Sequence, residues 1–389
     1  MSSGIDVRRE VRGSVAAGFE DVRAEFAAVL AELPDEPGAQ LAAYVHGRPV
    51  VDLWAGLGMA GDTLSAVYSA TKGAAHLVVA LLVQDGVLDL DREVAHYWPE
   101  FAAGGKGALT LRELLAHRSG VIGVDGGFTI AELADDRVLA ARLAGQRPYW
   151  EPGTAYGYHA YVIGALTGEV VRRATGHSIQ EVFEQRLRAP YDLDMYMGLP
   201  AALEPRRLDT LPMQPTPEQR ARLAANAPKP LSRTGVAFNL NADPPTDLVE
   251  FANTPAVRSL GPASTGGVGN ARGLARMYAA AIGEVDGHAA LLKPETVAEF
   301  ARVHWHGTDV VTGEHDHFAL GFEAQGVRYP FLGADAFGHS GVAGAQTFAD
   351  PSSGVAYAYT RRRLAYPGGA APENDRLAAA VVRAAAAVG

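Results

Sequence analysis

The stretch Tyr68-Ser69-Ala70-Thr71-Lys72 runs into Gly-Ala-Ala-His-Leu-Val-Val-Ala-Leu-Leu-Val, residues 73–83. Because residues 73–83 carry no acidic or basic side chain apart from one histidine and are apolar nearly all round, they predict a buried helix over Lys72–Gln84 that Asp85-Gly86 ends. Ser69 and Lys72 are three residues apart, so in a helix they lie on one face, one turn apart. A lysine at the start of a buried helix is unusual and calls for an explanation.

One explanation for a buried lysine at this position is its chemical reactivity. A desolvated lysine loses its proton more easily and can then help to activate a neighbouring hydroxyl group. The backbone N–H groups at the start of a helix also favour negative charge that develops there. From the residues alone an alternative stays open, in which Ser69 caps the helix and Lys72 is a solvated residue of its first turn.

Length and composition narrow the class of protein. The chain has 389 residues, a net charge of −10 and no cysteine, which excludes thiol nucleophiles, thiolate metal sites and disulfide scaffolds. Only four of the 34 basic residues are lysines, and no basic run points to nucleic acid or to an anionic membrane as a partner. The N-terminal residues lack an apolar stretch, and the best apolar run, Leu77–Val83, is too short to cross a bilayer. We therefore expect a cytoplasmic protein with no membrane partner.

Hydrophobic periodicity predicts strands near both ends of the chain and helices between them. The predicted helices are Val15–Leu33, Lys72–Gln84, Thr110–His117 (with a capping box formed by Thr110 and Glu113), Val162–Ala174 before Gly176, Leu274–Ala281 and Asn374–Val388. The predicted strands are the hairpin Leu41–Val45 and Val50–Trp54, then Phe318–Ala324, Ala345–Ala349 and Val355–Thr360. This order indicates an α+β fold in which one α/β layer is built from both ends of the chain and a helical part is inserted.

Residues 205–255 contain nine of the 23 prolines. We expect a long irregular segment there rather than a packed run of helix, and such segments are usually either functional or mobile.

Four motifs in order resemble the serine β-lactamase and penicillin-binding-protein superfamily, and within it the class C-like family VIII carboxylesterases. Ser69-Ala70-Thr71-Lys72 matches the S-x-x-K motif, and Leu114-Leu115-Ala116-His117-Arg118-Ser119-Gly120 is similar to L-L-x-H-x-S-G. Trp150-Glu151-Pro152-Gly153-Thr154 with Tyr158-His159-Ala160 matches the segment of the catalytic tyrosine. Gly338-His339-Ser340-Gly341 falls where the family has its K-T-G strand. The resemblance covers roughly residues 41–358.

The resemblance implies an antiparallel sheet flanked by helices from both ends of the chain, with an inserted mostly helical domain. We expect the sheet domain to comprise residues 1–68 and 286–389. The helical domain would then comprise residues 69–285 and include the proline-rich segment 205–255.

The resemblance also implies roles for single residues. Ser69 would be the nucleophile, and Lys72 and Tyr158 would share the role of base, because a nearby ammonium favours the phenolate form of a tyrosine. The backbone N–H groups of Ser69 and Val342 would form the oxyanion hole. The choice of Tyr158 rests on the family spacing, and from the residues alone Tyr156 and Tyr161 remain open.

Two departures from the family pattern bear on the substrate. His339-Ser340-Gly341 replaces Lys-Thr-Gly, so an imidazole that is mostly neutral at pH 7 stands where an ammonium would hold a substrate carboxylate. Ala160 stands where the Tyr-x-Asn motif has its asparagine. Both changes favour a small neutral ester, and we expect a carboxylesterase for short-chain esters. The alternatives are a β-lactamase, amidase, peptidase or acyltransferase with the same site, or a non-catalytic binding relative.

Other candidate residues are weighed by their surroundings. His339, Ser340, Gly341, Tyr149 and Trp150 are the expected substrate-binding residues. Two further groups have a possible ligand chemistry, namely the histidine-rich pair His304-Trp305-His306 and His315-Asp316-His317, and the glycine-rich turn at residues 266–273. We expect no metal and no cofactor, because neither spacing is specific, and we expect His76 and His117 to be core histidines. The sequence leaves the oligomeric state open.

Overall fold

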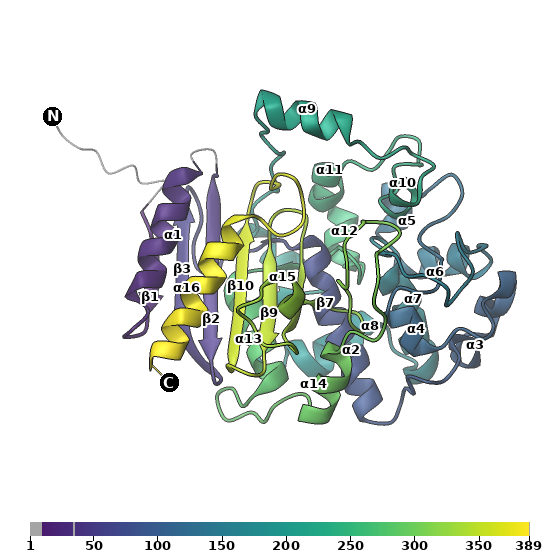
Figure 1. The fold of residues 1–389 in the computed structure, drawn as a ribbon, viewed down its shortest axis with the longest axis horizontal. Helices are drawn as coiled ribbons and strands as arrows, with labels where there is room; N and C mark the ends of the chain where they lie inside the picture. Colours follow the sequence, from purple (N-terminus) through teal and green to yellow (C-terminus); the bar gives the residue numbers. More distant parts are fainter. Residues whose placement is uncertain (1–9, 34–35, 389) are drawn as a thin grey trace.

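The frame of the molecule is a seven-stranded antiparallel sheet, shown in Figure 1, in a computed structural model that describes residues 10–33 and 36–388. Its strand order is β1-β3-β2-β10-β9-β8-β7. The strands are β1 (Arg12–Val15), β2 (Gly38–Val45), β3 (Arg48–Gly56), β7 (Glu323–Ala324), β8 (Phe337–Ser340), β9 (Gln346–Asp350) and β10 (Val355–Arg361). Because β2 pairs with β10, the two ends of the chain share one sheet, which confirms the α+β prediction.

Both faces of the sheet are buried. Successive side chains of a strand point to opposite faces, so Leu41 and Ala43 pack with α1 (Glu20–Glu32) and α16 (Glu373–Val388). Their neighbours Ala42 and Tyr44 belong to the other core, which includes α13 (Ala271–Ile282). Figure 1 shows α1 and α16 side by side on one face of the sheet, as the prediction of helices from both ends requires.

The remaining helices lie beyond the β7 edge of the sheet or around it (Figure 1). They are α2 (Thr71–Gln84), α3 (Val94–Tyr97), α4 (Leu111–Leu115), α5 (Ile130–Leu133), α6 (Asp136–Ala144), α7 (Ile163–Thr175), α8 (Ile179–Phe183), α9 (Pro217–Ala225), α10 (Arg233–Ala237), α11 (Leu248–Asn253), α12 (Pro255–Leu260), α14 (Pro294–Ala301) and α15 (Gln325–Arg328). A small sheet joins β4 (Ser65–Ala66), β6 (Val268–Gly269) and β5 (Met195–Tyr196). The exact division into two domains stays a prediction.

The helices predicted from local signals are present. The Thr110 side chain accepts from the Glu113 N–H while Glu113 reaches back to the Thr110 N–H, which is the expected capping box at the start of α4. Gly176 ends α7 with φ 79°, a left-handed conformation that glycine adopts without a steric penalty. Helix α2 is buried from Thr71 to Leu82, as its composition predicts.

Three predictions of local structure were wrong in part. The first helix begins at Glu20 and not at Val15, because Val15 ends strand β1. Of the strand predicted over Phe318–Ala324, only Glu323–Ala324 pairs as β7, because Gly321 turns the chain with φ 79°. At Gly321 the chain also passes so close to His76 that a Cβ would lie 2.4 Å from the imidazole ring.

The third concerns the proline-rich segment, which contains α9, α10 and α11. In α9 Pro217 occupies the first turn and Thr216 caps the helix, so proline starts this helix instead of preventing it. Helix α9 has no buried residue, whereas α10 buries Val236 and α11 buries Phe251, so only part of the segment packs against the rest of the protein. Across residues 10–33 and 36–388, no helix is both long and apolar enough to cross a membrane.

The contact between α2 and α13 gives a stability prediction. A Cβ at Gly73 would lie 2.1 Å from the Tyr278 hydroxyl oxygen, so Gly73→Ala should overpack this contact. We expect it to lower the free energy of unfolding by about 2 kcal/mol, although alanine favours a helix by about 1 kcal/mol. Denaturant unfolding measures the change.

Two controls isolate the clash. Tyr278→Phe removes the nearest atom, so Gly73→Ala should cost clearly less in that background. Gly145→Ala adds a methyl group where nothing lies within 4 Å and should change stability by less than about 0.5 kcal/mol. Equal costs for Gly73→Ala in both backgrounds would contradict the packing argument.

Candidate active site

Ser69 lies in a tight turn that leads into α2. Tyr68 has φ 49°, a strained backbone conformation for a tyrosine, and its hydroxyl is fixed by donating to the Leu248 carbonyl at 2.9 Å. Thr71 Oγ1 donates to the Tyr68 carbonyl at 2.5 Å and accepts from the Gly267 N–H at 2.9 Å. These contacts fix the turn Tyr68–Ala70, which includes Ser69. They also hold the glycine-rich turn against the start of α2.

The amine of Lys72 is fully buried and makes three polar contacts. Nζ lies 3.1 Å from Ser69 Oγ, 2.6 Å from the Ala160 carbonyl and 2.9 Å from the Ser264 carbonyl. Burial lowers the pKa of the Lys72 amine well below its ordinary value, against the attraction of Glu323. The alternative of a solvated first-turn lysine is therefore wrong, and the neutral amine is favoured.

Tyr158 approaches Ser69 from a different segment. Its hydroxyl donates to Ser69 Oγ at 2.8 Å, and Lys72 Nζ lies 4.9 Å from the centre of its ring. Phe318 stacks on the ring with centroids 5.2 Å apart. The Tyr158 N–H donates to Asp309 Oδ2 at 2.9 Å, so a buried carboxylate fixes the backbone of this residue.

The expected phenolate character of Tyr158 is not what its surroundings favour. Burial raises the pKa of Tyr158, and Glu323 adds to the rise, while the hydrogen bond with Ser69 opposes it. The sequence-based expectation weighed only a nearby ammonium. Because burial acts on Lys72 as well, both groups beside Ser69 are favoured in their neutral forms.

The hydroxyl groups of the other two candidate tyrosines do not contact Ser69. Tyr156 donates to the Gly307 carbonyl at 2.6 Å, and the Tyr161 hydroxyl is buried without a hydrogen-bond partner among the described residues. Of the three candidates, Tyr158 alone bonds Ser69 within the described chain. Its neighbour His159 bonds Ser119 at 2.6 Å and the Gly157 carbonyl at 2.6 Å, which ties the tyrosine segment to the L-L-x-H-x-S-G segment.

Strand β8 ends beside the turn that carries Ser69. A Cβ at Gly341 would lie 2.3 Å from the Val67 carbonyl oxygen, so a residue with a side chain would push the two segments apart. Ser69 and Val342 both line the cavity described below, and their backbone N–H groups bond no acceptor in the part of the chain that is described. Two free N–H groups at one cavity are what an oxyanion hole requires.

His339 and Ser340 have different positions at the end of β8. Ser340 lines the cavity, whereas His339 is 1% exposed and is not part of the lining. Burial lowers the pKa of His339 to about 4, so its imidazole is neutral at pH 7, as expected from its place in the sequence. Its Nδ1 lies 2.9 Å from the Ser340 carbonyl and 3.3 Å from Glu323 Oε1.

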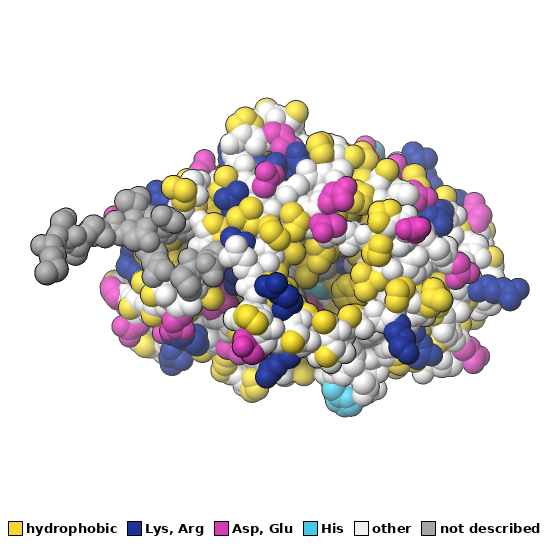
Figure 2. Space-filling model, turned by 90° about the horizontal axis from the view of Figure 1, so that it is seen from above, with side chains coloured by type: hydrophobic (Ala, Val, Ile, Leu, Met, Phe, Trp, Pro, Cys, Tyr) yellow, Lys and Arg dark blue, Asp and Glu magenta, His cyan; other side chains and the backbone are white. Residues whose placement is uncertain are grey.

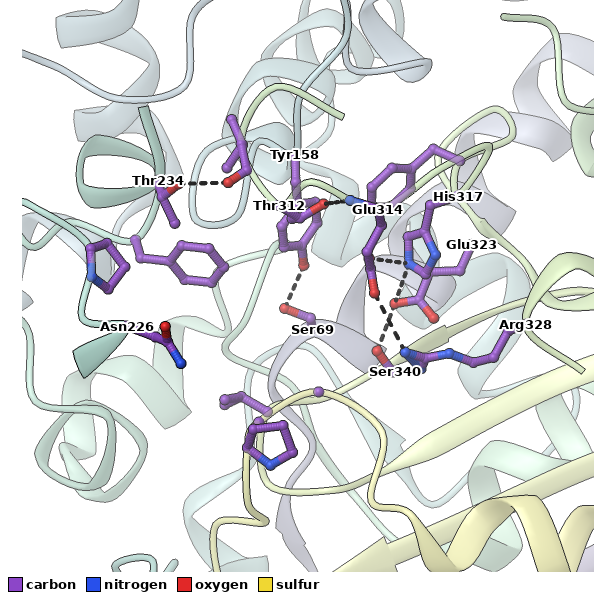
Figure 3. Close-up of a pocket in the computed structure, with 18 of the residues that line it drawn as sticks. Ser69, Tyr158, Asn226, Thr234, Thr312, Glu314, His317, Glu323, Arg328 and Ser340 are labelled. Atoms are coloured by element: carbon purple, nitrogen blue, oxygen red, sulfur yellow. Dashed lines mark hydrogen bonds and ion pairs between the residues drawn. The ribbon is translucent and has the colours of Figure 1, made fainter. Parts of the chain in front are cut away.

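Ser69 and Tyr158 line a cavity of about 630 Å³. In Figure 3 they lie between two groups of lining residues, with Asn226 and Thr234 on one side and Glu314, His317, Glu323, Arg328 and Ser340 on the other. In the view from above (Figure 2) the molecule is hollowed near its centre, and hydrophobic side chains surround the hollow. The proline-rich segment supplies part of the wall, namely Asn226, Pro228, Ser232, Thr234 and Phe238. The sequence analysis missed these residues, because only the fold brings the segment over the site.

Glu323 was not predicted as a site residue either, although the sequence contains a signal for it. A single carboxylate in the apolar run Phe318-Ala-Leu-Gly-Phe-Glu323-Ala324 is a buried charge that needs partners. Burial opposes its charge, but His339, His317 and Arg328 outweigh burial and hold the pKa of Glu323 well below its usual range.

Several predicted residues lie away from the cavity. Tyr149 and Trp150 are not part of its lining, and the Tyr149 hydroxyl donates to Asp125 at 3.0 Å. His76 and His117 were expected to be hydrogen-bonded core histidines; both are fully buried, but among the described residues the hydrogen bonding holds for His117 alone of the two. His117 accepts the His159 N–H at 3.2 Å, whereas neither ring nitrogen of His76 has a partner in the described chain.

The histidine-rich pair does not converge on one point. His317 turns toward Glu323, with Nε2 and Oε1 3.7 Å apart, while His306 pairs with Asp316 at 3.2 Å. No group of three or more His, Cys, Asp or Glu side chains able to hold a metal ion occurs among residues 10–33 and 36–388.

Comparison with known proteins gives consistent matches over almost the whole chain. The Beta-lactamase family model matches residues 26–382. Esterase/beta-lactamase LipL of Mycobacterium tuberculosis is 32% identical over 94% of this chain and 86% of its own. The structure of EstA from Arthrobacter nitroguajacolicus Rue61a shares 39% identity and a TM-score of 0.87, covering 96% of this chain and 98% of that chain. A family VIII carboxylesterase structure shares 34% identity and a TM-score of 0.85, with coverage of 96% and 100%.

The buried amine predicts a pH dependence of stability. The unfolded chain holds the Lys72 proton up to about pH 10.5, while the native state releases it at lower pH, so unfolding takes up a proton between these values. Stability of the wild type relative to Lys72→Met should therefore rise with pH below pH 10.5, by at most about 1.4 kcal/mol per pH unit.

Denaturant unfolding across this pH range measures the difference. Lys229→Met, at an exposed position, controls for the loss of one surface charge. Parallel pH profiles for the wild type and Lys72→Met would mean that the native amine keeps its proton.

Proposed function

The chain belongs to the Beta-lactamase family, and on that premise we propose that it is a serine hydrolase that cleaves short-chain carboxylic esters through an acyl-enzyme on Ser69. One observation carries the proposal. Ser69 Oγ lies at a cavity within hydrogen-bond distance of both a buried amine, Lys72, and a buried phenol, Tyr158. The names of the relatives, which include an esterase/β-lactamase and a family VIII carboxylesterase, support the ester as the substrate class.

The proton transfers follow from the neutral forms of the two groups. Ser69 Oγ attacks the ester carbonyl carbon, and its proton passes to the Lys72 amine 3.1 Å away. The carbonyl oxygen takes up the negative charge, which the N–H groups of Ser69 and Val342 stabilise. Tyr158 gives its proton to the leaving alcohol oxygen as the C–O bond breaks, and the Lys72 ammonium then returns a proton to the phenolate.

Deacylation runs through the same groups in reverse. Water enters where the alcohol was, gives a proton to this pair, and attacks the acyl carbon. Ser69 Oγ leaves with a proton, and the carboxylic acid departs. No cofactor or metal takes part in this scheme, and the partner is the ester itself.

The neutral amine explains why a serine with no histidine beside it can act as the nucleophile. A protonated Lys72 would have no lone pair to accept the Ser69 proton. The carbonyl groups of Ala160 and Ser264 each accept one N–H of the amine, which leaves the lone pair directed toward Ser69 in the neutral form.

β-Lactam hydrolysis is the less favoured candidate. The name of the M. tuberculosis relative includes both activities. In this chain, however, a neutral and buried His339 occupies the position from which an ammonium would hold a β-lactam carboxylate. We expect p-nitrophenyl butyrate to be turned over with a kcat/KM at least about 100-fold above that of a cephalosporin.

The acyl-enzyme predicts a mass shift. Incubation with p-nitrophenyl butyrate should add one butyryl group to the intact protein, because the acyl group stays on Ser69 until water releases it. Ser69→Ala should lack this adduct and lose more than about 10³-fold in rate. Intact-mass spectrometry detects the adduct, and wild-type activity in Ser69→Ala would exclude this nucleophile.

The three tyrosines provide a matched set for the proton-transfer role. Tyr158→Phe should lower kcat by at least about 10²-fold, because it removes the hydroxyl that bonds Ser69. Tyr156→Phe and Tyr161→Phe remove hydroxyl groups that do not contact Ser69 and should stay within about fivefold of the wild type. A similar loss in all three variants would point to packing instead of proton transfer.

A further inference from the structure

The hydroxyl of Ser340 gives its proton to a buried carboxylate of the same cavity. Ser340 lies at the end of β8 and lines the cavity, and its Oγ–H donates to Glu323 Oε1 at 2.6 Å (Figure 3). A hydroxyl group has one proton and two lone pairs. With the proton given to Glu323, only lone pairs remain for a substrate, and no donor in the described chain occupies them.

The surroundings of Glu323 keep that proton where it is. Gln325 Nε2 donates to the second carboxylate oxygen at 3.0 Å, and the Nδ1 of His339 and the Nε2 of His317 lie 3.3 and 3.7 Å from Oε1. The carboxylate is thus surrounded by nitrogen donors and is 3% exposed. A buried carboxylate is a stronger acceptor than any neutral group that a substrate offers, so Ser340 stays committed to it.

Two basic side chains line the cavity near Ser340. Arg328 lies 3.8 Å from Glu314, and His317 lies 3.3 Å from Glu314 as well as near Glu323. Both lie beside acidic side chains, although Arg328 Nη1 is buried without a hydrogen-bond partner in the described chain. At Ser340 itself a substrate would meet lone pairs, with the negative charge of Glu323 behind them, which favours a donor group over an acceptor.

We propose that Ser340, positioned by Glu323, is a hydrogen-bond acceptor that selects esters carrying a donor group, a hydroxyl or an amine. This proposal rests on the proposed esterase function and names the substrate class of that site. Ser340 would touch the substrate, and Glu323 would act through Ser340 as a positioning residue. An ester without a donor group leaves the Ser340 oxygen without a hydrogen bond, and the free-energy cost of this is the source of the selectivity.

Matched ester pairs test the selectivity. Methyl 3-hydroxybutyrate, as both enantiomers, and methyl 3-methylbutyrate differ by a hydroxyl group in place of a methyl group on the acyl side. The pair 2-hydroxyethyl butyrate and propyl butyrate tests the alcohol side. We expect kcat/KM to favour the hydroxylated ester about tenfold in at least one pair.

Three variants assign the preference to Ser340 and Glu323. The measured quantity is the ratio of kcat/KM within a pair, so a general loss of activity cancels. Ser340→Ala should bring the ratio to about one, and Ser340→Thr, which keeps the hydroxyl group, should retain most of it. Glu323→Gln should lower the ratio, because a neutral amide no longer fixes the Ser340 proton.

The outcomes of these assays separate a failure of the selectivity from a failure of the proposed function. Ratios near one for the wild type in both pairs would overturn this proposal and leave the esterase function intact. An undiminished ratio in Ser340→Ala, or a Glu323→Gln ratio equal to that of the wild type, would also overturn it. If no ester is hydrolysed at all, not even p-nitrophenyl butyrate, the proposed function fails and the selectivity fails with it.

Discussion

A lysine amine that is cut off from water must find acceptors inside the protein, and the site around Lys72 is organised by this requirement. Two carbonyl groups supply them, from Ala160 and from Ser264, which belong to segments far apart in the sequence. The third contact is Ser69 itself. Helix α2, the tyrosine segment and the residues just before the glycine-rich turn therefore meet at one nitrogen atom, and a shift of any of them would leave a buried polar group without a partner.

Two neighbouring groups of the cavity lining differ in electrostatic character. Burial favours the neutral forms of Lys72 and Tyr158, which lie beside Ser69. Glu323, in contrast, is favoured in its charged form, and it raises the pKa of His317 by hydrogen bonding and attraction, although burial opposes this. In the proposed mechanism, protons move between the neutral groups, while the charged groups hold the Ser340 proton in place.

Local patterns were sufficient where a residue's role depends on its near neighbours in sequence. The apolar run after Lys72 predicted α2 within one residue, and the Thr110 capping box is present. Contacts between segments far apart in the sequence could not be predicted from local patterns. Nothing near Ser340 indicates that its proton goes to Glu323, seventeen residues earlier, and nothing in the proline-rich segment indicates which surface it covers. The expected phenolate of Tyr158 failed for the same reason, since burial is a property of the whole fold and not of a motif.

The pairing of β2 with β10 has a consequence for the order in which the protein takes shape during translation. Val45 pairs with Val355, so β2 leaves the ribosome about 300 residues before its partner strand. Until then β2 and β3 form a hairpin with an open edge, and α1 lacks α16. Helix α2, which carries Lys72, and the irregular segment that carries Tyr158 are synthesised in this interval, before the sheet that supports them is complete. Chain elongation at roughly 5–20 residues per second makes this a wait of tens of seconds, in which an exposed strand edge is open to chaperones and to aggregation.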